Sequence, residues 1–196
     1  MKYPNMTWGT MEAIVNKLGG EEKAKAFLRG AAEVAWTKLL EAIGAVKVTV
    51  EEKFVAKEKF REDSKEVKFY GIWSNFTKWF LSSEGTIEEP VGDQELRYGK
   101  LIKGSVDGPI IEELGGEAKA ETTLSEMYTL LKEQSNGEDG VLLTNGYANI
   151  FYVHDTSGVL RAVNVIWFVG GWRVSAYSVV HPLDWNAGFQ VFSRNS

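Results

Sequence analysis

The sequence predicts an α+β fold, in which an N-terminal helical unit is followed by a C-terminal antiparallel β-meander packed with one or two helices. Two observations predict it. Apolar residues recur at helical spacing over the first 45 positions, and beyond residue 141 short runs of β-branched and aromatic residues alternate with turn residues. The chain has 196 residues, 44% of them hydrophobic, so it can bury a full core. We divide it into a three-helix unit, 1–45, and an α+β domain, 46–196.

Three helices are expected in the N-terminal unit, each ended by glycine. The first follows Thr7, a favourable N-cap residue. The second runs from 21 to 28, and the third covers 31–43 before Gly44. The first helix carries an apolar stripe at i, i+3, i+4 and i+7, which consists of Met11, Ile14, Val15 and Leu18.

The middle of the chain holds short elements of both kinds. Alternating valines over 46–50 predict a strand, whereas the charged stretch 51–66 predicts an exposed ribbon or a linker. Residues 68–73 predict another strand, and Ser74 can cap a short helix after it. The segment 96–105 fits a strand or a helix.

The C-terminal part has the clearest pattern. Thr123-Leu-Ser-Glu126 is a capping box, which predicts the start of a helix with one apolar side. Beyond Val141 almost every apolar run is strand-like and is bounded by turn residues. The predicted strands are 141–143, 148–154, 159–168, 172–180 and 189–193.

Composition excludes several classes of site. The absence of cysteine removes disulfides, thiolate metal sites and thiol nucleophiles, and two histidines without a metal-binding spacing predict no metal centre and no cofactor. The net charge is −5, and residues 91–140 hold five Lys or Arg against eleven Asp or Glu, which argues against nucleic-acid binding. No apolar run is long enough to span a membrane and no leader is visible, so we expect a cytoplasmic protein.

The function we expect is that of a non-enzymatic binding or regulatory protein with a protein partner or a small ligand. Both faces of the predicted strand 159–168 are largely apolar, so each must be covered. Aromatic stripes are usually core, but incompletely covered Trp and Tyr side chains suit an interface. The candidate partner-binding residues on this aromatic-rich sheet face are Tyr152, Arg161, Asn164, Trp167, Trp172 and Tyr177.

The alternative is a carboxylate-dependent hydrolase that uses the acidic segment 91–140 with His154 or Asp155 as acid or base. Glu112 and Glu113 are the densest acidic group beside turn-forming residues, although such charges are more often solvated. Asp155 lies in Asp-Thr-Ser-Gly between two predicted strands, so we assign it to a hairpin turn. Paired carboxylates in a cleft would favour the hydrolase.

Distinctive motifs are spread over nearly the whole chain. They are MTWGTMEAIVNKLGG near the start, EKFVAKEKF at 52–60, NFTKWFL at 75–81, SVDGPIIEELGGEAKAETTL at 105–124, ANIFYVHD at 148–155 and VFSRNS at 191–196. Together they resemble an uncharacterised family of small proteins from environmental and candidate-phylum bacterial genomes. The resemblance implies a bacterial protein, but no activity, cofactor or catalytic residue follows from it.

Overall fold

The computed structural model describes residues 7–18, 20–29, 38–180 and 183–194. The chain forms two compact units, residues 1–37 and residues 38–196. No helix in these described ranges is long and apolar enough to cross a membrane.

The first unit contains the helices α1 (Trp8–Lys17) and α2 (Glu21–Leu28), where the first two helices are predicted. Gly20 lies between them with a φ of 100°, a conformation that favours glycine, and its N–H donates to the Val15 carbonyl. The chain therefore turns at this glycine.

The predicted third helix is wrong in its C-terminal part. Residues 31–37 lie outside the described residues, but a strand begins at Leu40, and Leu40 is in register with Leu101 of a second strand. The spacing of Leu39, Leu40 and Ile43 suits a helix, yet pairing with a distant strand decides the local structure. A three-helix unit over 1–45 is thus not shown.

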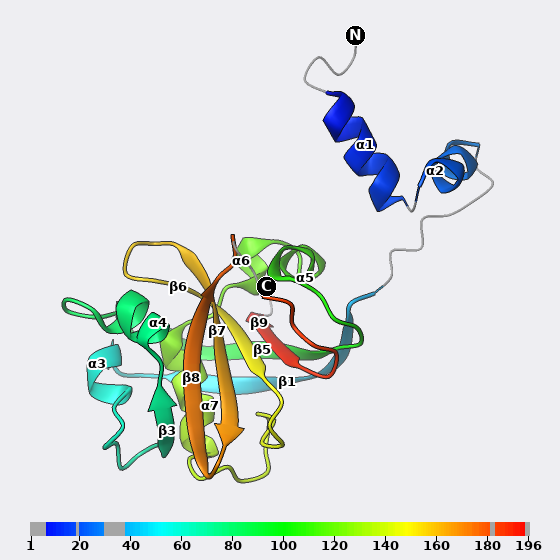
Figure 1. The fold of residues 1–196 in the computed structure, drawn as a ribbon. Coiled ribbons are helices and arrows are strands. Elements are labelled where there is room, and N and C mark those ends of the chain that lie inside the picture. Colours follow the sequence, from blue (N-terminus) through cyan, green and yellow to red (C-terminus); the bar gives the residue numbers. More distant parts are fainter. Residues whose placement is uncertain (1–6, 19, 30–37, 181–182, 195–196) are drawn as a thin grey trace. The chain divides into compact units, whose positions relative to one another are not determined.

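A seven-stranded, mostly antiparallel sheet forms the second unit. Its strands are β1 (Leu40–Val50), β3 (Phe69–Ile72), β5 (Gly92–Leu101), β6 (Asn149–His154), β7 (Leu160–Phe168), β8 (Gly171–Ser178) and β9 (Gln190–Arg194). Their order is β1-β5-β9-β6-β7-β8-β3, which Figure 1 shows as one curved sheet. β6, β7 and β8 are consecutive antiparallel neighbours, whereas β9 is parallel to β6 and β3 is parallel to β8. The sheet is therefore larger than the predicted meander.

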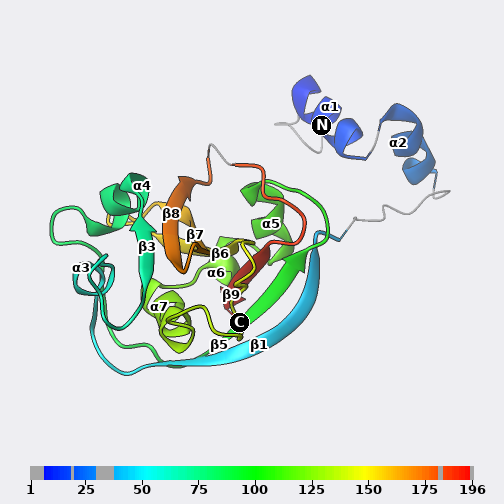
Figure 2. The same ribbon diagram turned by 60° about the horizontal axis from the view of Figure 1, so that its bottom comes forward.

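The remaining elements are short except for one helix. They are β2 (Phe54–Val55), paired with β4 (Ile87–Glu88), and the helices α3 (Ala56–Lys59), α4 (Ser74–Phe76), the π-helix η1 (Thr77–Leu81), α5 (Asp107–Glu113), α6 (Glu117–Ala120) and α7 (Leu124–Glu133). The sheet curls around α7, as Figures 1 and 2 show.

The predicted capping box at the start of α7 is confirmed. The Glu126 N–H donates to Thr123 Oγ1 at 3.2 Å, and the Thr123 N–H donates to Glu126 Oε2 at 2.7 Å. These two bonds satisfy amide groups that a helix start would otherwise leave without partners.

The core consists of one apolar cluster on each face of the sheet. The inner cluster surrounds α7 and includes its residues Leu124, Met127 and Leu131. Each of the seven strands adds at least one buried side chain to this cluster. The outer cluster contains Ile110 of α5 and Trp185, which cover β6 and β7 from the other side. Both faces of the central strands are buried, as their apolar composition predicts.

The predicted exposed ribbon at 51–66 is wrong in part. Phe54 and Phe60 are buried, and their ring centroids lie 5.7 and 5.5 Å from that of Tyr128 in α7. Their charged neighbours point outward, so the sequence around them looks solvated. Burial here depends on a helix that is far away in the sequence.

Three smaller expectations are now decided. The ambiguous segment 96–105 is largely strand, since β5 extends to Leu101. The strand predicted at 141–143 is wrong, because these residues form bends and coil. Ser74 is the first residue of α4 and not its cap, since the N-cap residue is Trp73 and makes no side-chain cap bond.

Candidate partner-binding site

β3 lies beside the β7–β8 hairpin at one corner of the sheet (Figure 1). Exposed aromatic side chains gather at this corner. Tyr70, Trp73 and Phe168 are 52%, 47% and 42% exposed, and Val169 at the hairpin tip is 74% exposed. Arg173 of β8 is half-buried among these rings. We call these five residues the corner patch.

Arg173 organises the corner patch. Its guanidinium carbon lies 5.0 Å from the ring centroid of Trp73 and 5.4 Å from that of Phe168, both within cation–π range. The Tyr70 ring meets the Phe168 ring edge to face, with 5.2 Å between centroids. Two of the three rings therefore lie against one cation, the third packs on Phe168, and all three remain open to solvent.

Strand register brings these side chains to one face. Ile166 is in register with Arg173, and Gly71 of β3 is in register with Arg173 from the other side. Ile166 is buried under the outer cluster, but Phe168, two residues on and on the same face, is exposed. The cover over this face thus ends between these two positions.

Close approach of β3 to the hairpin depends on a glycine. A Cβ on Gly171 would lie 2.6 Å from the backbone nitrogen of Tyr70, which is closer than a Cβ approaches a non-bonded backbone atom in proteins. Only glycine therefore allows Tyr70 and Phe168 to meet across these strands.

The hairpin tip carries local backbone strain. Val169 and Gly170 form the two-residue turn, with φ values of 49° and 81°. Such a turn favours Asn-Gly or Gly-Gly, because a β-branched residue with positive φ suffers steric conflict. Strained backbone positions cluster at sites of function. The strained and exposed Val169 therefore supports this corner as a candidate functional site.

Three of the six sequence-predicted partner-binding residues, Tyr152, Asn164 and Trp172, are buried, so the expectation that they are exposed is wrong. Tyr152 and Trp172 are both 0% exposed, on opposite faces of the sheet. The Trp172 indole N–H donates to the Gln134 carbonyl at 2.8 Å. Each ring is covered by helices or loops from its own side, and the two rings cannot belong to a single surface.

The three predicted residues that are not buried have their aromatic contacts outside the corner patch. Trp167 packs edge to face on the inner-face Trp172, and Tyr177 packs on Trp185 of the outer cluster. Arg161 stacks on the ring of Trp79, with 4.1 Å between its guanidinium carbon and the ring centroid. The six residues are therefore divided between both faces.

Sequence reasoning did not identify the corner patch, because the exposure of its rings depends on where α5 and Trp185 stop covering the outer face of the sheet. The run FYGIW over 69–73 is apolar throughout, so its sequence does not tell which ring stays open. One sequence feature could have pointed to the patch. Val169-Gly170 stands where a hairpin turn favours Asn-Gly, and a residue that conflicts with its turn is a reason to look there.

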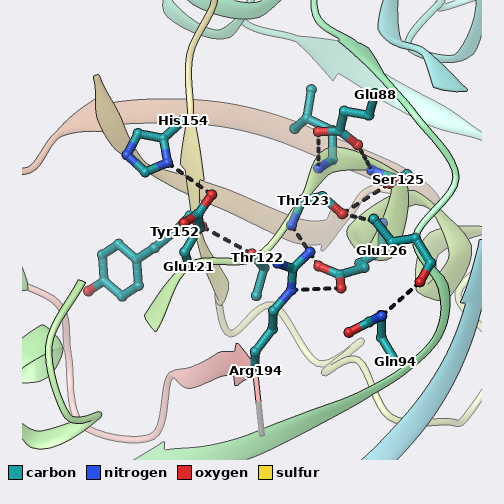
Figure 3. Close-up of polar contacts among 12 residues, drawn as sticks. Glu88, Gln94, Glu121, Thr122, Thr123, Ser125, Glu126, Tyr152, His154 and Arg194 are labelled. Atoms are coloured by element: carbon teal, nitrogen blue, oxygen red, sulfur yellow. Dashed lines mark hydrogen bonds and ion pairs between the residues drawn. The ribbon is translucent and has the colours of Figure 1, made fainter. Parts of the chain in front are cut away.

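The structure brings His154 together with two carboxylates of the acidic segment. Its Nδ1 lies 3.0 Å from Glu121 Oε1, and its Nε2 lies 3.2 Å from Glu117 Oε1; Figure 3 shows the ring beside Glu121. The carboxylates occupy both ring nitrogens from two edges of the ring, so they do not converge on one point. Within the described ranges, no group of His, Asp and Glu side chains is arranged to hold a metal ion.

Asp155 has the turn role expected of it. Its Oδ1 accepts from the N–H groups of Ser157 and Val159, and its Oδ2 accepts from Arg161 Nε at 2.7 Å. Burial would raise the pKa of Asp155, but these hydrogen bonds outweigh burial and hold the pKa below its usual value. The carboxylate therefore fixes the hairpin and its charge is matched by Arg161.

Asp107 and Glu113, two of the acidic residues in 107–113, hold elements on the outer face together. Asp107 is 0% exposed, and its Oδ1 accepts from Tyr152 Oη and from the Trp185 indole N–H, while burial raises its pKa. Glu113, one of the predicted acidic pair, accepts from the N–H groups of Leu39 and Leu40 at 2.6 and 2.9 Å. These carboxylates hold different elements and do not form a paired site.

Figure 3 also shows the polar contacts at the start of α7. Glu88 of β4 accepts from the N–H groups of Leu124 and Ser125 at 2.9 and 2.8 Å. A negative charge at this helix end is favourable because the helix dipole is positive there. These contacts join β4 to α7 and give the network a structural role.

Comparison of the chain with protein-family models, with curated proteins and with solved structures gave no match. The resemblance to an uncharacterised bacterial family remains a prediction.

Proposed function

We propose that this protein is a non-enzymatic binding protein and that the corner patch is the surface on which a protein partner docks. One observation carries the proposal: Tyr70, Trp73 and Phe168 stay exposed while Arg173 holds two of them in place. Trp, Tyr and Arg are the residues most often responsible for affinity at protein interfaces. Rings that are already ordered lose little freedom when a partner binds.

The charge at this corner indicates the chemistry of the partner. Lys68 is exposed, and its Nζ lies beside Gly170 of the hairpin, close to the tip that Val169 forms. A cation next to an apolar centre complements an apolar surface with an acidic rim. We therefore propose a protein partner that presents an apolar side chain flanked by Asp or Glu.

The hydrolase alternative has weaker support. A general base needs a free lone pair within reach of a substrate proton, and both ring nitrogens of His154 are occupied by Glu117 and Glu121. Asp155 is committed to its turn and to Arg161. The proposal therefore rests on binding.

The test is site-specific photo-crosslinking with matched valines. A photoreactive amino acid replaces Val169 in one version of the full chain and Val159, at the end of the β6–β7 turn, in the other. In extract of the native host, position 169 should crosslink to one protein that position 159 does not capture. Equal capture from both positions would reject the corner patch as the docking surface.

The captured protein is then purified and titrated with variants. Trp73→Ala and Phe168→Ala should each weaken binding about 30-fold, the loss typical of a hot-spot aromatic. Tyr147→Ala removes another ring that is 44% exposed and should leave affinity unchanged. Retained affinity in both patch variants, with unchanged melting temperature, would contradict the proposal.

A further inference from the structure

Two adjoining hollows lie along the solvent-facing side of α7. Their volumes are about 520 and 320 Å³, and the larger is within the range of small-molecule sites. Both are lined by Lys59 and Tyr128, so they form one groove across these two residues. We call it the α7 groove, and it is separate from the corner patch in its lining residues.

One polar stripe of α7 lines the groove. Tyr128, Thr129 and Lys132 follow Ser125 at i+3, i+4 and i+7, so all four lie on the same side of the helix. The opposite side carries Met127 and Leu131 into the inner core. The groove side of this helix thus presents hydroxyl groups and an ammonium group.

Glu66 lies where these groups meet and shows how a carboxylate is held there. Its Oε2 lies 3.1 Å from Lys59 Nζ, and the Tyr128 hydroxyl donates to the same oxygen at 3.1 Å. The hydrogen bond from Lys59 lowers the pKa of Glu66, and burial opposes it with a smaller effect. Tyr128 and Lys132 lower this pKa further. Two ammonium groups and a phenol therefore act on a single exposed carboxylate.

We propose that the α7 groove binds a small ligand through a carboxylate or phosphate group, and that Glu66 occupies the position of that anion in the free protein. Glu66 is about half exposed and belongs to the segment 61–68 between α3 and β3, so it can leave without disturbing the core. An incoming anion would take over the donors Lys59 Nζ and Tyr128 Oη, with Lys132 one turn further along the helix. Charge-assisted hydrogen bonds of this kind favour anions over neutral ligands.

The test measures binding of two defined anions by calorimetry at low salt. Inorganic phosphate and succinate are titrated separately into the full chain, its Glu66→Gln variant and its Asp63→Asn variant. Asp63 lines the smaller hollow and pairs with Arg61, so its loss changes the net charge equally without freeing Lys59 or Tyr128. Glu66→Gln should bind one of the anions at least tenfold more tightly than the unaltered chain, and the stronger anion identifies the ligand group.

Further variants assign the donors. In the Glu66→Gln background, Lys59→Gln should abolish the gain and Tyr128→Phe should reduce it several-fold, with melting temperatures that stay close to that of the parent. An equal gain in Asp63→Asn would reveal a general charge effect and overturn the proposal. Absence of binding of both anions to Glu66→Gln would also overturn it.

Discussion

Arg194 and Glu126 form an ion pair across the inner face of the sheet, with 3.0 Å between Nε and Oε1. The Glu126 side chain is 0% exposed, whereas that of Arg194 is 28% exposed. The pair joins β9 to the first turn of α7. The two carboxylate oxygens of Glu126 thus have separate partners, because Oε1 accepts from Arg194 and Oε2 accepts the capping-box bond from the Thr123 N–H.

Arg194→Met should lower the free energy of unfolding by about 2–4 kcal/mol, because it leaves the buried Glu126 charge without its cation. Urea denaturation measures the loss. Arg61→Met is the control, since Arg61 and Asp63 are both largely exposed and solvent screens their pair, so its loss should change stability little. Equal losses in the two variants would contradict the importance of the buried pair.

Glu88→Gln should destabilise the protein by about 1 kcal/mol, since a neutral amide interacts less favourably with the N–H groups of Leu124 and Ser125 at the helix start. Thermal unfolding followed by circular dichroism measures it. The neighbouring Glu89→Gln is the matched control, because Glu89 is exposed and its carboxylate pairs with the exposed ammonium group of Lys53. Its melting temperature should stay within the error of the parent.

The pH dependence of stability should reveal Asp155. Its pKa is lower in the folded chain than its usual value of 3.8, so its contribution is complete above that value and is lost as pH falls through the folded pKa. At pH 7, Asp155→Asn should be about 1–3 kcal/mol less stable than the parent, since Arg161 loses a charged acceptor. The difference should shrink below about pH 4. A constant difference across this range would contradict the ionised role.

Sequence patterns identified the structure where the deciding contacts are local. The capping box needs only Thr123 and Glu126, and the β6–β7 hairpin needs only the turn at Asp155 and its flanking strands. The same reasoning failed at Phe54 and Phe60, whose burial depends on Tyr128 more than 60 residues away. It also failed for the corner patch, since an exposed ring and a buried ring have the same sequence pattern.

Fragments test where the second unit begins. Residues 38–196 should unfold cooperatively, whereas 46–196 should be markedly less stable, because it lacks the start of β1 that pairs with Leu101 and is held by Glu113. The sequence-based division after residue 45 predicts instead that 46–196 keeps a cooperative melt. Denaturant unfolding of both fragments, with sheet content followed by circular dichroism, separates these outcomes.

Val169→Gly should raise stability by about 1 kcal/mol while weakening partner binding. Glycine adopts the positive φ of this turn without steric conflict, but it removes the exposed apolar tip of the corner patch. Thermal unfolding and titration with the crosslinked partner measure the two effects. Val159→Gly is the control, since the φ of Val159 is not positive and glycine should therefore bring no gain in stability there.

The position of β9 has a consequence for biosynthesis. β9 lies between β5 and β6, so it is the strand that connects β1 and β5 to the group formed by β6, β7, β8 and β3. Synthesis proceeds from the N-terminus, and every other strand leaves the ribosome before residues 190–194. Until then the nascent chain holds two partial sheets, each with an open edge that can pair with other chains. Ribosome-bound chains that stop before residue 190 are therefore expected to engage chaperones, and release of those chaperones should follow translation of β9.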